Sequence, residues 1–404
     1  MAFKDLLELT KKQFLKKNPE ADVEFRAASE EPAPTGLIVD NPLFEYLLDR
    51  RFLAYGRFVL VYGKKGSSKT SLFLDLAKLY QRVGGDVIWI ETEHAIDLDY
   101  VKKQGVDLSK IAVIHPDSLE QGLGIAEAII RNMPKAYPEG DTPVLIAFDS
   151  IAGAAVEYEL DTSNTISDIQ PGIHARLLSR FFRELEKPLA NEKAVFLMLN
   201  QLKSKIGGMG YGEDAHDALI GGEAQFFHSS IHLKMAKIQE MTAPGGEDGA
   251  TRKIGSVHKL QCKRNKLGRE GKNQEVEIDL YIDGGIDWWS PLVRKLAKEY
   301  TSLVTRSGAY YRWNIPNTAY VDPETKKPAV IDTEKSFREA ELAMVIRAST
   351  AAKDEIRKAF GIPALPAAKE VEEVESTRKK KRKAALKTED PAPVTRTVSL
   401  VEGA

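Results

Sequence analysis

The sequence contains almost no cysteine. Cys262 is the one cysteine among 404 residues. A single thiol cannot form a disulfide within the chain, and it cannot build a metal centre that needs several thiolates. The composition is therefore typical of a protein in a reducing compartment, and we expect a cytoplasmic location.

The chain also lacks an excess of charge of one sign and a long apolar run. Its 58 Lys and Arg residues nearly balance 59 Asp and Glu residues, so the formal net charge is −1. Any surface that binds nucleic acid must therefore be a limited patch of positive charge and not a property of the whole chain. No run of about eighteen apolar residues occurs, and the first residues do not resemble a signal peptide, so we expect no membrane partner.

A glycine-bearing segment stands between an apolar strand pattern and an amphipathic helix pattern. The predicted strand covers residues 58–62, and the predicted helix begins near residue 70. The segment between them is Gly63, Lys64, Lys65, Gly66, Ser67, Ser68, Lys69 and Thr70, followed by Ser71. Backbone N–H groups and a helix N-terminus in this order bind nucleotide phosphates. A surface turn rich in Gly, Ser and Lys is the alternative, but the order of the elements favours the phosphate loop.

The side chains of this loop predict a nucleoside triphosphate and Mg²⁺ as cofactors, and the resemblance described below implies that the nucleotide is ATP. Lys69 would reach the β- and γ-phosphates, and the hydroxyl of Thr70 would bind Mg²⁺. Ser68 stands directly before the lysine, where such loops usually have glycine. It adds a Cβ at a point where the backbone must pass close to a phosphate.

Apolar segments without alternation follow this loop and are separated by helical patterns. The predicted strands are residues 87–90, 144–148 and 194–199, and the predicted helices are residues 119–131 and 171–186. Apolar strands of this kind are typical of a parallel sheet that is covered on both faces. We therefore predict an α/β fold with a mainly parallel central sheet.

Polar side chains come directly after these strands, where a parallel sheet opens onto its ligand. Glu93 is a candidate general base for the water that attacks the γ-phosphate. Asp149 follows a buried strand in the manner of a Walker B carboxylate, and it would share Mg²⁺ with Thr70. Gln201 could bond the γ-phosphate and report its loss.

A basic, glycine-rich stretch follows Gln201. It contains Lys203, Lys205, Gly207 and Gly208. Such a stretch could contact a nucleic-acid backbone, and an ordinary surface loop is the alternative.

The order of these motifs resembles that of the RecA recombinase family. Residues 93–97, with Tyr100 and residues 105–107 after them, are similar to the family signature that follows the phosphate loop. Residues 200–207 and 221–227 resemble its nucleotide-sensing strand and the end of its second DNA loop. Segments 282–287 and 308–311 resemble most the phage branch, the UvsX-type recombinases. The resemblance spans about residues 36–315.

The resemblance implies roles for particular residues. Lys69, Glu93 and Gln201 would act at the γ-phosphate, and Asp97 and Tyr100 would contact the adenine side of ATP. Arg264 and Lys266 would enter the ATP site of a neighbouring subunit and neutralise charge in the transition state. Residues 157–172 and 202–220 would form two DNA loops, and the DNA-contacting residues would be Arg176, Lys203, Lys205, Gly207, Gly208, Gly221 and Gly222. Because phage relatives also vary at the position of Ser68, we expect altered ATP turnover and not its loss.

The remaining segments are predicted as follows. Residues 3–17 form an amphipathic helix, 238–253 an exposed loop, and 256–262 with 274–282 a pair of strands. The parts would be an N-terminal helix and linker for subunit contact (1–35), a RecA-like P-loop ATPase core (36–290), a small α+β C-terminal domain (291–362) and a disordered tail (363–404). The tail carries six basic residues, 378–383, which could attract DNA or be merely solvated.

The resemblance implies an ATP-dependent recombinase for DNA recombination and repair. Subunits would form a helical filament on single-stranded DNA, because a head-to-tail interface that does not close generates a helix. The filament would pair with homologous duplex DNA and exchange strands, and ATP hydrolysis would release the DNA. Single-strand-binding and loader proteins are possible partners. A RecA-like DNA-dependent ATPase with a regulatory or helicase role, without strand exchange, is the alternative.

Overall fold

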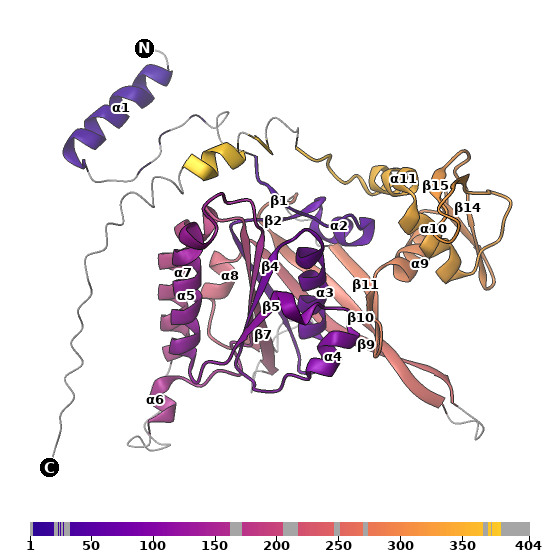
Figure 1. Cartoon of the computed structure of the whole chain (residues 1–404), viewed down its shortest axis with the longest axis horizontal. Coiled ribbons are helices and arrows are strands. Elements are labelled where there is room, and N and C mark those ends of the chain that lie inside the picture. Colours follow the sequence, from indigo (N-terminus) through magenta and orange to yellow (C-terminus); the bar gives the residue numbers. More distant parts are fainter. Residues whose placement is uncertain are drawn as a thin grey trace.

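A large, mainly parallel sheet runs through the centre of the molecule (Figure 1). In spatial order its strands are β12 (Gly285–Asp287), β11 (Gln274–Tyr281), β10 (Thr251–Asn265), β9 (Ile231–Pro244), β3 (Arg57–Gly63), β7 (Ala194–Ser204), β6 (Val144–Asp149), β4 (Asp86–Glu91) and β5 (Ile111–Ile114). The strands from β9 to β5 pair in parallel, and those from β12 to β9 pair antiparallel. The sheet confirms the predicted α/β fold.

The structure is a computed structural model of the chain. It describes residues 3–19, 23, 25, 27, 33–161, 172–204, 217–245, 251–269, 274–366, 371, 372 and 374–380. Three of the predicted DNA contacts, Lys205, Gly207 and Gly208, therefore lie outside the described residues, as do most of the two predicted DNA loops.

Helices cover both faces of the sheet, which explains why its strands read as unbroken apolar runs. Phe58, Leu60 and Tyr62 of β3 face a core formed with α5 (Leu119–Ala136) and α7 (Ile173–Ala190). Val59 and Val61 face the opposite core, to which α3 (Lys69–Arg82) contributes. Alternate side chains are thus buried on opposite sides, and each large apolar one contributes about 1.5–3 kcal/mol.

The predicted exposed loop at residues 238–253 is wrong for most of its length. β9 extends into this segment as far as Pro244 and β10 begins at Thr251, and the two strands form a two-stranded ribbon in which Pro244 pairs with Thr251. Figure 1 shows this ribbon projecting from the body of the molecule. Its side chains are mostly exposed, and Glu240 pairs with both Lys237 and Lys253. A ribbon with two solvated faces needs no apolar alternation, so no strand pattern can be recognised there in the sequence.

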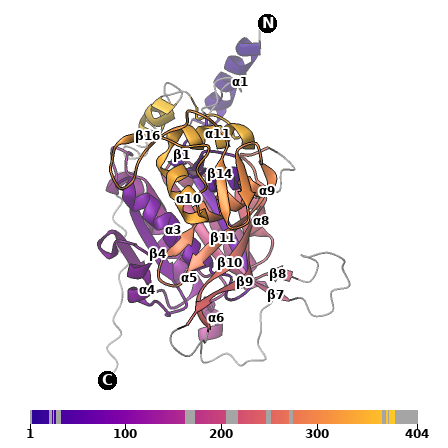
Figure 2. The same ribbon diagram turned by 90° about the vertical axis from the view of Figure 1, so that its right-hand side faces the viewer.

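The C-terminal elements share their apolar core with the sheet. They are α9 (Trp289–Glu299), β13 (Val304–Ser307), β14 (Tyr310–Trp313), β15 (Ala319–Val321), β16 (Pro328–Val330), α10 (Glu339–Ala348) and α11 (Thr350–Phe360). They are mixed α and β, as predicted, and lie together in Figure 2. One apolar cluster runs from Val59 through Leu292 to Ile356, so the boundary at 290–291 stays a prediction.

A buried ionic network ties α11 to the N-terminal part of the core. Arg357 donates two hydrogen bonds, both 2.7 Å long, to the carboxylate of Glu45 on α2 (Pro42–Leu48). Its guanidinium also donates to Asp40 at 2.8 Å and to Asp354 at 2.9 Å. Glu45 is 0% exposed, so its charge depends on this partner.

Part of the predicted disordered tail (363–404) is helical. Residues 374–380 form a short helix, seen near the top of Figure 1. Val374 is buried, Glu375 pairs with Lys193 at 3.3 Å, and Arg378 donates to the hydroxyl of Thr35 at 3.0 Å. The prediction of disorder is therefore wrong for these residues. The first member of the basic run packs on the protein, while residues 381–383 lie outside the described part.

Helix α1 (Phe3–Lys17) matches the predicted N-terminal helix and stands apart from the body in Figure 1. Phe3 is 67% exposed and Leu6 is 56% exposed, so much of its apolar face is uncovered in one chain. Within the described part of the chain, every helix is too short or too polar to cross a membrane.

We predict that Arg357→Met lowers the free energy of unfolding by about 3 kcal/mol, because it leaves the carboxylate of Glu45 buried without its main partner. Urea denaturation followed by circular dichroism measures the change. Lys358→Met, on the exposed side of the same helix, is the matched control and should change stability little. Equal denaturation midpoints for the two variants would contradict the prediction.

Candidate functional site

The phosphate loop has the predicted position between β3 and α3. Gly63 ends the strand, and a Cβ there would overlap the carbonyl oxygen of Met235 on β9. Gly66 has a φ of +76°, a left-handed conformation that glycine adopts without strain. The N–H of Ser67 donates to the carbonyl of Lys64 at 3.1 Å and closes the turn. The loop therefore brings its backbone N–H groups to the N-terminus of α3.

Ser68 adopts a left-handed conformation, with a φ of +64°. Such a conformation costs a residue with a side chain about 1–2 kcal/mol. Its hydroxyl lies 3.4 Å from Nε2 of His258 on β10, and the hydroxyl of Ser256 lies 2.8 Å from the same nitrogen. Sequence reasoning missed His258 and Ser256, because only the fold brings β10 beneath the loop.

Lys69 is buried over the phosphate loop. Its Nζ donates to the carbonyls of Gly63 and Lys64, both at 3.3 Å, and to the hydroxyl of Ser67 at 3.5 Å. Burial lowers the pKa of Lys69, and the negative charges of Asp149 and Glu93 oppose that shift. The ammonium group therefore lies at the phosphate loop, where it could bind a β- or γ-phosphate.

Thr70 and Asp149 meet at the ends of α3 and β6. The hydroxyl of Thr70 donates to Asp149 Oδ2 at 2.8 Å. Burial raises the pKa of Asp149 to about 6, and the charge of Glu93 adds to the increase. A buried carboxylate beside a hydroxyl offers the oxygen ligands that Mg²⁺ prefers, and its charge is poorly solvated without a cation. These residues therefore fit Mg²⁺.

Glu93 links the ends of three neighbouring strands. Its Oε1 accepts from the hydroxyl of Ser150 at 2.8 Å and from the amide of Gln201 at 3.0 Å. Ser150 follows β6, and Gln201 belongs to β7. The structure thus brings together Glu93 and Gln201, which are 108 residues apart in the sequence.

Asn200, beside Gln201, anchors the turn at residues 220–222. Its amide donates to the carbonyl of Ile220 at 2.7 Å and to Gln225 Oε1 at 2.8 Å. The amide of Gln225 donates to the same carbonyl at 2.7 Å. Gln225 lies on α8 (Ala224–His228) and is fully buried, and sequence reasoning missed it.

Several of the predicted DNA contacts surround this turn. Gly221 and Gly222 have φ values of +86° and +76°, and a Cβ on Gly222 would lie 2.9 Å from that of Ala175. Arg176, next to Ala175, is exposed in the first turn of α7. Lys203 is exposed near the end of β7, which pairs with β8 (Asp217–Leu219; Figure 2).

The other predicted site residues lie in two places. Asp97 accepts from the N–H of Tyr100 at 3.1 Å and caps α4 (Leu98–Lys103), while the hydroxyl of Tyr100 lies 2.9 Å from that of Ser71. Arg264 and Lys266 are exposed at the end of β10, where they donate to carbonyl groups of α8. The contact of Asp97 and Tyr100 with adenine stays a prediction. The contact of Arg264 and Lys266 with a neighbouring subunit does so too.

We predict that His258 makes stability depend on pH. Burial lowers the pKa of His258 to about 4, whereas an unfolded histidine has a pKa near 6.5. Unfolding therefore takes up a proton between these pH values, and the free energy of unfolding should fall as the pH falls from 6.5 to 4. Above pH 6.5 this contribution should be constant.

The variant His258→Gln keeps a polar group near Ser68 and Ser256 but removes this proton uptake. Urea denaturation at a series of pH values should give a flatter curve for the variant than for the wild type, since other groups contribute equally to both. Parallel curves would show that His258 is not buried in its neutral form.

Comparison with known proteins shows the family to which the chain belongs. The sequence profile of the RecA N-terminal domain matches residues 48–287, more than half of the chain. The "Protein RecA" of Chloroherpeton thalassium is 31% identical over 269 residues, which cover 67% of this chain and 69% of that protein. The "Protein RecA" of Geobacter sulfurreducens is 33% identical over 258 residues, covering 64% and 70% respectively. The chain therefore belongs to the RecA family.

Proposed function

We propose that the protein is an ATP-dependent recombinase that assembles as a helical filament on single-stranded DNA and exchanges strands with homologous duplex DNA. Its role would be in DNA recombination and repair, in the cytoplasm. The observation that carries the proposal is the chain of contacts from Glu93 through Gln201 and Asn200 to the turn at 220–222. These contacts join the candidate catalytic carboxylate to the end of a predicted DNA loop.

At the nucleotide site, the phosphate-loop N–H groups and Lys69 would bind the β- and γ-phosphates. Thr70 and Asp149 would hold Mg²⁺, which supplies positive charge to the phosphate oxygens when it is bound. Glu93 would orient the attacking water and accept its proton. Tyr100 and Asp97, at the start of α4, would contact the adenine side.

Gln201 would connect the nucleotide to DNA. Its amide now donates to Glu93, and a γ-phosphate would offer it a competing acceptor. A change of partner would shift Gln201 and therefore also Asn200 and the turn that it anchors. The positions of Arg176, Lys203 and the segments that follow would then change. Binding of ATP and binding of DNA would then be linked and reciprocal.

Subunit contacts would come from two exposed features. The uncovered apolar face of α1, with Phe3 and Leu6, would pack on a neighbouring subunit. Arg264 and Lys266 would reach the neighbour's ATP site from the edge of β10, which would make hydrolysis depend on assembly. Such a head-to-tail arrangement extends into a helix if it does not close.

Other parts of the proposal concern relatives and partners. Segments 282–287 and 308–311 support a place in the phage UvsX-type branch. Single-strand-binding and loader proteins are the partners that we expect. Because Arg378 packs on Thr35, any attraction of DNA by the tail would depend on the later basic residues.

A strand-exchange assay tests the proposed function. With ATP and Mg²⁺, the protein should convert circular single-stranded DNA and homologous linear duplex into joint molecules, and it should not do so with heterologous duplex. Lys69→Ala removes the charge that binds the phosphates and should abolish the products. DNA-stimulated ATP hydrolysis without joint molecules would instead favour a regulatory ATPase, and closed rings in negative-stain images would favour a helicase.

Glu93→Gln should keep ATP binding but slow hydrolysis by about 10²–10⁴-fold, because the amide preserves the geometry and removes the base. Phosphate release and binding of a fluorescent ATP analogue measure the two properties separately. Glu127→Gln is the control, since it is the same substitution on the exposed surface of α5. Turnover at the wild-type rate in Glu93→Gln would remove this residue from the mechanism.

A further inference from the structure

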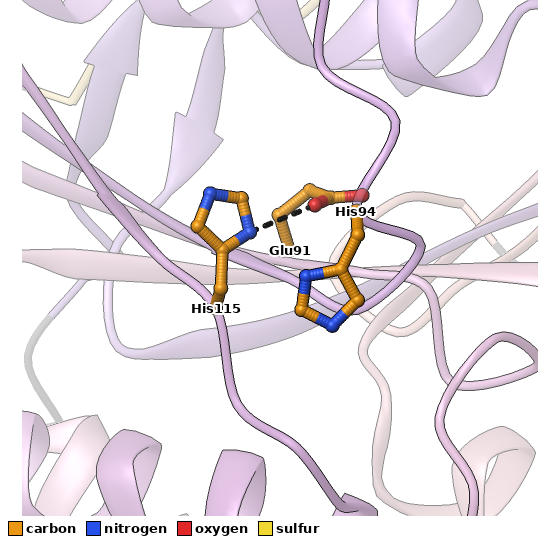
Figure 3. A group of neighbouring side chains, drawn as sticks. All are labelled: Glu91, His94 and His115. Carbon is orange, nitrogen blue, oxygen red and sulfur yellow. Dashed lines mark ion pairs between the residues drawn. The ribbon is translucent and has the colours of Figure 1, made fainter.

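Three side chains with metal-binding atoms converge at the edge of the sheet beyond Glu93. Glu91 ends β4, His94 lies in the segment after it, and His115 directly follows β5. One ligand atom from each residue lies within 4.8 Å of the others. Figure 3 shows the carboxylate and the two imidazole rings gathered in one place. The proposed recombinase mechanism uses none of these three side chains.

The fold itself creates this convergence. β4 and β5 pair in parallel with Ile90 opposite Ile114, so Glu91 and His115 are neighbours at the strand ends. His94 has a φ of +50°, a left-handed conformation that is uncommon for a residue with a side chain. Its ring stacks on that of His115, with centroids 5.3 Å apart and planes at 28°.

The carboxylate of Glu91 is buried and incompletely satisfied. Glu91 is 3% exposed, and its Oε1 accepts from the N–H of Glu93 at 2.9 Å. Its Oε2 makes no hydrogen bond of normal geometry to the described residues, although Nδ1 of His115 lies 3.0 Å away. A buried carboxylate oxygen without a full partner is costly, and a bound cation would relieve that cost.

The cluster also has access to solvent. His94 and His115 are exposed and line a cavity of about 400 Å³ together with Ile96, Leu98 and Val113. An ion can therefore reach the three ligands from this side, and a water molecule can take a remaining coordination position.

We propose that Glu91, His94 and His115 form a binding site for a divalent transition-metal ion, and that Zn²⁺ fits it best. Two imidazole nitrogens and one carboxylate oxygen suit Zn²⁺, whereas Mg²⁺ prefers oxygen ligands alone. Donor atoms around tetrahedral Zn²⁺ are about 3.3 Å apart. Nδ1 of His115 already lies 3.0 Å from Oε2 of Glu91, and the ligand atoms all lie within 4.8 Å of one another, so a small adjustment of the exposed rings would complete the geometry. The site shares no residue with Thr70 and Asp149, although Glu91 lies opposite Asp149 in the sheet.

Occupation of this site would tie the end of β5 to the segment that carries Glu93. Glu91 and His94 flank that residue in the sequence, so an ion bound to both would restrain the backbone between them. The site stands on the geometry of three side chains, and its existence does not depend on the proposed strand exchange.

The test uses the full-length protein, treated with a chelator and then dialysed. Titration with Zn²⁺ alone, in competition with a chromophoric zinc indicator and with excess Mg²⁺ present, should show one ion bound per chain. His115→Gln should weaken binding at least tenfold, because it removes one of three ligands. The same zinc concentration should raise the melting temperature of the wild type and not that of the variant.

His228→Gln is the matched control. His228 lies 2.9 Å from the carboxylate of Glu186, so it forms a similar histidine–glutamate pair at a different site. This variant should bind zinc like the wild type. His94→Gln provides a second test of the cluster if His115→Gln does not fold. Wild-type affinity in a folded cluster variant, or no zinc bound by the wild type, would overturn the proposal.

Discussion

Parallel pairing of β3, β7, β6 and β4 in one register is the constraint on which the site depends. Gly63 lies opposite Gln201, and Asp149 lies opposite both Glu91 and Leu199. A shift of one residue in any of these pairs would turn the polar ends toward the opposite core. Burial of apolar side chains on both faces opposes such a shift. The same burial that stabilises the sheet therefore sets the positions of the phosphate loop and the carboxylates.

The site concentrates buried charge at this edge. Asp149 is buried beside Lys69, and Glu93 adds a second negative charge nearby. Burial lowers the pKa of Lys69 and raises the pKa of Asp149, because neither charged side chain is fully solvated. A ligand that carries both phosphates and a cation would complete this arrangement.

The sequence predicted what is encoded locally. The phosphate loop and the strands around Asp149 and Gln201 could be recognised because composition changes sharply at each of their ends. His258 could not, since it reaches Ser68 only through the register of β10 against β9 and of β9 against β3. The ribbon formed by residues 238–244 and 251–253 has two solvated faces and thus no apolar pattern. The helix at 374–380 is held by partners that are distant in the sequence. Convergence of Glu91 with His115 likewise follows from strand pairing alone.

The apolar cluster that joins the sheet to α9, α10 and α11 has a consequence for motion. Leu292, Leu342 and Ile356 pack in the same core as Val59, and the Arg357–Glu45 pair adds a buried ionic link across it. Hinge motion between these regions would expose apolar surface to water and leave the carboxylate of Glu45 without its partner. Movement of the C-terminal elements relative to the sheet is therefore costly. A ligand bound at the phosphate loop would change the conformation of the loops at the strand ends more easily.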